Sequence, residues 1–110
     1  MELSQQIASV LIELKQAGLS IQGNASHETW HSLVERYNIL FLGEKFNTIY
    51  CRELLYTLND KFQISIGIEE LLSLIPQICF TLGMKTEPLV RLEDAGNPMA
   101  PIAEYSIKLF

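Results

Sequence analysis

The chain of 110 residues is 48% hydrophobic and 19% charged, a composition that fits one compact domain with its own core. Its net charge is −5 and its sequence pI is near 4.9, so DNA, RNA or an anionic membrane would repel it at long range. Non-specific attraction to these surfaces is therefore not expected.

Nothing at the start of the sequence indicates secretion. Glu2 stands where a signal peptide would carry basic residues, and the apolar residues that follow are periodic rather than continuous. No apolar run approaches the roughly 20 residues that a membrane-spanning helix needs. We therefore expect a cytoplasmic chain without a membrane partner, folded as a single domain over residues 1–110.

A first helix is predicted over residues 3–17, and Gly18 is expected to end it. Its apolar positions recur three and four residues apart: Leu3, Ile7, Val10, Leu11 and Leu14. Ile12 lies beside this stripe and widens it, which makes a homodimer a hypothesis to test. Residues 19–27 follow as a linker rich in turn formers, with Ser26 as the cap of the next helix.

A second helix is predicted over residues 27–38, with its apolar face formed by Trp30, Leu33, Val34 and Tyr37. Its opposite face carries His27, His31 and Glu35 four residues apart, a spacing that zinc sites use on helices. Because the sequence offers no further ligand at a matching spacing, we expect a solvated polar face and neither a metal nor a cofactor.

Residues 39–42 (ILFL) form a short apolar run that either finishes this helix or makes a strand, since periodicity cannot separate the two at this length. A helix is then predicted over residues 47–62, capped by Asn47 or Thr48. Its apolar stripe consists of Cys51, Leu54, Leu55, Leu58 and Phe62.

The next helix is predicted within residues 64–85, capped by Ser65 or Gly67 and ended by Gly83. Pro76 should kink this helix or split it, because proline removes a backbone donor and crowds the carbonyl four residues earlier. A wide apolar surface is formed by Leu71, Leu72, Leu74, Ile75, Ile78, Cys79 and Leu82. The opposite face carries a polar row of Glu70, Ser73, Gln77 and Thr81.

The two cysteines, Cys51 and Cys79, both fall on apolar stripes, and neither belongs to a CxxC motif. Two buried, reduced thiols are the favoured interpretation over a metal or redox pair. A disulfide remains open if the two helices cross at these positions.

Two segments of alternating character, residues 87–94 and 102–109, predict a β-hairpin. In the second segment the apolar positions are Ala103, Tyr105, Ile107 and Leu109. Between the two segments, residues 95–101 (AGNPMAP) contain two prolines and predict a stiff, exposed loop.

This order of elements resembles the winged helix-turn-helix superfamily, in which a helix, a short strand, two further helices and a hairpin follow one another. The resemblance covers residues 27–110 and leaves residues 1–18 as an extra N-terminal helix. It requires residues 39–42 to be a strand that pairs with residues 105–109. It implies an α+β fold, a winged-helix-like domain whose helices pack on a small antiparallel sheet with the hairpin loop as the wing.

Members of that superfamily bind DNA through the second helix of the pair and the wing. The resemblance thus implies Ser73, Gln77 and Thr81 at base edges, and it places Lys85, Arg91 and Arg52 at phosphates. Acidic residues at the start of the helix and in the wing would meet phosphates unfavourably: Glu69, Glu70, Glu93 and Asp94.

No catalytic arrangement is visible. A nucleophile needs a base and an oxyanion site, yet both histidines fall in one exposed stretch and the six glycines are isolated from one another. We expect a non-enzymatic module that contacts another protein or itself, as an adaptor, an assembly subunit or an inhibitor. The residues expected to make this contact are Ser73, Gln77, Thr81, Lys85, Arg91, Asn97 and Met99. The alternative is a DNA-binding transcriptional regulator of the winged-helix type.

Overall fold

The chain folds into helices and a small sheet. The computed structural model describes residues 2–23, 27–43, 45–91, 93, 95–97, 99–100 and 102–110, without the side chains of residues 22 and 27–29. In chain order the elements are α1 (Leu3–Gly23), α2 (His27–Tyr37), β1 (Thr48–Tyr50), α3 (Cys51–Lys61), α4 (Ile68–Leu82), β2 (Lys85–Leu89) and β3 (Glu104–Lys108). The predicted α+β class is confirmed. No helix in the described part of the chain is long and apolar enough to cross a membrane.

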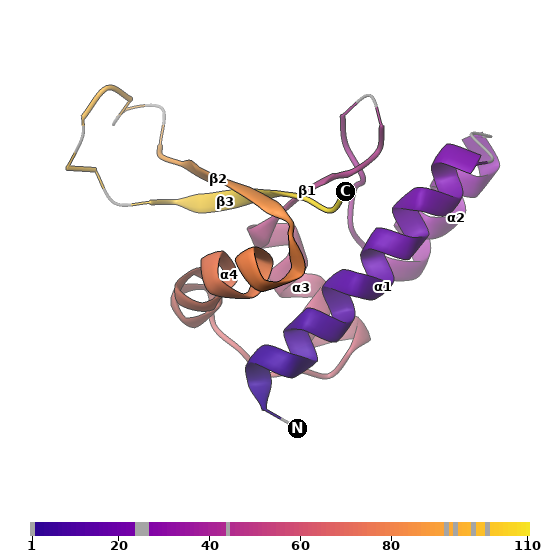
Figure 1. The fold of residues 1–110 in the computed structure, drawn as a ribbon, viewed down its shortest axis with the longest axis horizontal. Coiled ribbons are helices and arrows are strands. Elements are labelled where there is room, and N and C mark those ends of the chain that lie inside the picture. Colours follow the sequence, from indigo (N-terminus) through magenta and orange to yellow (C-terminus); the bar gives the residue numbers. More distant parts are fainter. Residues whose placement is uncertain are drawn as a thin grey trace.

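The three strands form one antiparallel sheet in the order β1-β3-β2, with the helices on one side of it (Figure 1). Ile107 of the central strand pairs with Ile49 of β1 and with Thr86 of β2. Both isoleucines are fully buried because this register points them at the helices. The β2–β3 hairpin extends away from the helices (Figure 1).

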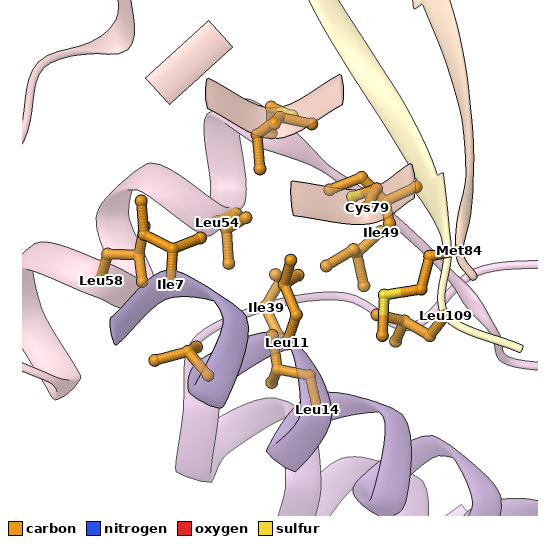
Figure 2. Close-up of a cluster of buried hydrophobic side chains, with 14 of the residues drawn as sticks. Ile7, Leu11, Leu14, Ile39, Ile49, Leu54, Leu58, Cys79, Met84 and Leu109 are labelled. Carbon is orange, nitrogen blue, oxygen red and sulfur yellow. The ribbon is translucent and has the colours of Figure 1, made fainter. Parts of the chain in front are cut away.

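One continuous core joins all of these elements. Figure 2 shows α1 contributing Ile7, Leu11 and Leu14, which meet side chains from α3, α4 and the sheet. The residues labelled there beside them are Ile39, Ile49, Leu54, Leu58, Cys79, Met84 and Leu109. The first helix is therefore part of the core rather than an appendage to it.

The first helix is longer than predicted. It continues through Gly18 to Gly23, so the expected stop at Gly18 and the linker beginning at residue 19 are wrong. Ile21 extends the buried stripe by another turn and is fully buried. A Cβ at residue 18 would lie 3.0 Å from Cε1 of Phe110 and 3.1 Å from the carbonyl oxygen of Phe46. Glycine there allows this close packing, and it does not end the helix. The predicted cap, Ser26, lies outside the described residues.

The short strand lies later in the chain than predicted. Residues 39–42 form no strand, although Leu42 makes an isolated bridge with Thr48. The strand is β1, which pairs with β3, and α3 starts only at Cys51, after Tyr50 and without a side-chain cap. The predicted cap by Asn47 or Thr48 is wrong. Threonine, isoleucine and tyrosine favour extended backbone, and pairing with β3 overrides the helical periodicity that continues into this segment.

The end of α2 depends on a side chain from α3. The hydroxyl of Thr57 is buried and donates to the carbonyl oxygens of Tyr37, at 2.7 Å, and Asn38, at 3.3 Å. Asn38 has a φ of 52°, in the left-handed region where helices commonly stop. A threonine nineteen and twenty positions away therefore satisfies the carbonyls that the end of α2 leaves open.

The boundaries of α4 follow the predicted glycines. Gly67 is the N-terminal cap, and Gly83 has a φ of 73° at the C-terminal cap. The amide of Met84 donates to the carbonyl of Cys79 at 2.8 Å, which closes the last turn. Pro76 lies inside one continuous helix, so the alternative of a split helix is wrong.

The hairpin is shorter than predicted. Its strands cover residues 85–89 and 104–108 in place of 87–94 and 102–109. The amide of Ala103 donates to the carbonyl of Leu89 at 2.8 Å, so strand pairing ends there and a longer loop begins. The paired positions of the hairpin run from Lys85 opposite Lys108 to Leu89 opposite Glu104.

We expect Leu11→Ala to lower the free energy of unfolding by about 2–5 kcal/mol, because it opens a cavity at a fully buried position. Ile12→Ala is the matched control on the same helix: Ile12 is 42% exposed, and its loss should cost less than about 1 kcal/mol. Urea unfolding monitored by circular dichroism measures both. Equal losses would contradict a core role for α1.

Thr57→Val should lower the free energy of unfolding by about 1–3 kcal/mol, because it leaves the buried carbonyl of Tyr37 at the end of α2 without its donor. Thr81→Val makes the same change at an exposed hydroxyl that bonds within its own helix, and it should be close to neutral. Chemical unfolding of the two variants gives the comparison. A Thr57 variant as stable as the Thr81 variant would refute the capping role.

Candidate functional site

The polar row of α4 lies along a hollow between α4 and α1. Ser73, Gln77 and Thr81 are all exposed, and their four-residue spacing places them on one side of the helix. The hollow has a volume of about 250 Å³. Its lining consists of Ser4, Gln5, Ala8, Ser73, Leu74, Gln77, Ile78, Thr81 and Leu82. The structure thus brings these three predicted contact residues together and adds a wall from α1.

Two of the three predicted polar groups already have partners in their own helix. The hydroxyl of Ser73 donates to the carbonyl of Glu70 at 2.7 Å, and that of Thr81 donates to the carbonyl of Gln77 at 3.0 Å. The side-chain amide of Gln77 makes no hydrogen bond to the described residues. Among the three, Gln77 is therefore the side chain with both donors and an acceptor to offer a partner.

The same side of α4 carries an exposed aromatic residue that is not among the predicted contact residues. Phe80 is 81% exposed. It follows Gln77 by three residues and Ser73 by seven, which places it on the polar side of the helix. This position on the helix could have identified it from the sequence. We call Ser73, Gln77, Phe80 and Thr81 the α4 face.

The remaining predicted contact residues lie elsewhere. Asn97 and Met99 lie in the hairpin loop, where the Asn97 side-chain oxygen accepts from the Met99 amide at 3.0 Å. Met99 is 87% exposed. The Arg91 guanidinium lies 3.6 Å from the Glu93 carboxylate, and both side chains are largely exposed. Lys85 begins β2, and none of these four residues lines the hollow between α1 and α4.

The histidine face on α2 does not assemble a metal site in the described part of the chain. His31 Nδ1 lies 3.6 Å from a carboxylate oxygen of Glu35, and both side chains are exposed. The side chain of His27 lies outside the described atoms. Among the described residues, no three His, Cys, Asp or Glu side chains come close enough to hold a metal ion.

Both cysteines are free and buried, as predicted, so the disulfide alternative is not observed. Burial raises the pKa of the Cys51 thiol to about 12 and that of the Cys79 thiol to about 11. Figure 2 shows Cys79 among the apolar side chains of the core. Thiols in such surroundings stay protonated and behave as small apolar groups.

No protein family, no curated protein and no solved structure matches this chain. A function is therefore inferred from the residues and geometry of this chain alone.

The buried thiols predict a pH dependence of stability. Because the folded pKa of Cys51 is raised above its ordinary value of 9.0, its contribution is complete below about pH 9 and is lost as the pH rises towards 12. We therefore expect the stability advantage of the natural protein over Cys51→Ala to shrink by about 1 kcal/mol between pH 9 and about pH 10. Unfolding in urea across this pH range measures it.

Leu54→Ala provides the control, because Leu54 is equally buried on the same helix and has no proton to lose. Its cost should stay constant over the same pH range. A constant cost for Cys51→Ala as well would show that the thiol is not held protonated by the fold.

Proposed function

We propose that this chain is a non-enzymatic protein-binding module whose contact surface is the α4 face, with Phe80 as the anchor. The observation that carries this proposal is the 81% exposure of Phe80 on a well-packed helix beside an open hollow. Aromatic side chains that fill a partner's pocket dominate the binding energy of many interfaces. Burying a phenylalanine contributes roughly 1.5–3 kcal/mol.

The charges around the anchor indicate the chemistry of the partner. Glu69 and Glu70 are exposed in the first turn of α4, and Glu69 lies on the same side of the helix as Ser73. A fitting partner presents an apolar socket for Phe80, a polar group for the Gln77 amide and basic side chains near the start of α4. That partner is another protein or a second copy of this chain, in which case the module is a homodimer.

The winged-helix-like arrangement remains a proposal, supported by the order of the elements. A helix, a strand, two helices and a hairpin follow one another, and the strand before α3 pairs with the last strand. DNA binding is the weaker of the two candidate functions. The first turn of α4 carries two exposed carboxylates, Arg91 lies beside Glu93, and α1 lies along the polar row that would have to enter the major groove.

Phe80→Ser should weaken partner binding or self-association by about 30-fold or more, the effect of losing an interface anchor worth ~2 kcal/mol. Light scattering after size-exclusion chromatography measures self-association. A photoreactive side chain at Gln77 identifies a partner by crosslinking in cells, and titration calorimetry then compares the variants. The fold should be unchanged because most of the Phe80 side chain is exposed to solvent.

Tyr56→Ser is the matched control, since Tyr56 is an aromatic residue with 62% exposure on α3, away from the α4 face. The proposal fails if the protein stays monomeric and position 77 crosslinks to no protein, or if Tyr56→Ser weakens binding as much as Phe80→Ser. Salt-sensitive binding to duplex DNA without any protein contact would favour the regulator instead.

A further inference from the structure

A second concavity opens on the sheet, at the end where α4 passes into β2. Its volume is about 470 Å³, and it shares no lining residue with the hollow between α1 and α4. The turn before β1, the start of β2 and the end of β3 supply its walls. Its lining includes Lys45, Asn47, Thr48, Lys85, Lys108 and Phe110. We call this the lysine concavity.

Three of the chain's five lysines meet in this concavity, although the net charge of the chain is −5. Lys85 and Lys108 lie directly opposite each other in the register of β2 and β3. Like charges at directly opposed positions destabilise an antiparallel pair. None of the three lysines forms an ion pair with a described residue, and the described lining contains no Asp or Glu side chain.

The described acids on this face of the sheet lie further along the strands. Glu87 is opposite Ser106, two positions along β2 from Lys85. A carboxylate oxygen of Glu104 accepts a hydrogen bond from the amide of Arg52 at 3.1 Å. Glu44, next to Lys45 in sequence, lies outside the described residues. Three lysines thus gather at one end of the sheet face, and no described Asp or Glu side chain forms an ion pair with them.

The wall between the lysines is held by hydrogen bonds. The Asn47 side-chain amide donates to the backbone oxygen of Phe110 at 2.5 Å, and the Thr48 hydroxyl donates to the Asn47 side-chain oxygen at 3.3 Å. The ring of Phe110 lies against Gly18 of α1, where no Cβ intervenes. These contacts hold Phe110 in place at the lysine concavity.

We propose that the lysine concavity binds the phosphate group of a small phosphorylated ligand. Lysine ammonium groups act as point charges for phosphate, each with three donors. The volume lies within the roughly 300–1,000 Å³ of small-molecule sites, so it leaves room for the body of the ligand beside Phe110. A small ligand fits better than a nucleic acid, because the net negative charge of the chain repels a long polyanion more strongly.

Pyrophosphate is the probe, followed by amide resonances in NMR and by thermal unfolding. It should shift the resonances of residues 45–48, 83–85 and 108–110 saturably and raise the melting temperature, because it binds the folded state. The double variant Lys85→Gln/Lys108→Gln should bind at least about tenfold more weakly, since two of the three charges that hold the anion are gone. Without pyrophosphate this variant should melt at a higher temperature than the natural protein, because the repulsion across the strands is removed.

Lys15→Gln/Lys61→Gln is the matched control with the same net charge, and it should bind pyrophosphate as the natural protein does. Phe80→Ser should also leave this binding intact, because Phe80 lies outside the lysine concavity. The proposal is overturned if no saturable shift occurs, or if the control double variant weakens binding equally. Tighter binding of duplex DNA than of pyrophosphate at equal phosphate concentration, lost in the Lys85/Lys108 variant, would overturn the assignment to a small ligand.

Discussion

The close packing of α1 against the rest of the chain is the constraint on which this structure depends. Ile7, Leu11 and Leu14 are fully buried, and Gly18 lets the helix approach Phe46 and Phe110. The same helix supplies one wall of the hollow beside the α4 face and supports the aromatic ring at the lysine concavity. A helix that looked like an addition to a shorter domain thus positions both candidate sites. The apolar stripe of α1 continues to Ile21, which is fully buried as well.

Features set by neighbouring residues could be predicted from the sequence. Helical periodicity and the glycines at 67 and 83 located α4, since a cap depends on backbone freedom at one residue. Two features depended on distant contacts and were mispredicted. Gly18 follows the local rule for a helix end, yet it serves a contact with Phe110. The short strand is Thr48–Tyr50 because β3, more than fifty residues later, pairs with it.

The candidate sites show the same division between features set by neighbouring residues and features set by distant contacts. The periodicity of one helix grouped Ser73, Gln77 and Thr81 correctly, because they share a side of α4. Phe80 was not grouped with them, because that row was defined by its polar residues and Phe80, three residues after Gln77, is apolar. The lysine concavity could not be predicted, because its three lysines come from separate segments. Only the register that places Lys85 opposite Lys108 brings them together.

One backbone turn connects the two surfaces. After Phe80 points into solvent, Gly83 adopts the left-handed conformation, Met84 turns into the core and Lys85 begins β2 beside Lys108. A side chain at residue 83 would strain this turn, because a φ of 73° disfavours residues with a Cβ. Such strain would displace the anchor of the α4 face and the edge of the lysine concavity together. The side chains of the two surfaces are distinct, however, so substituting Phe80 or Lys85 can remove one surface while the turn keeps the other in place.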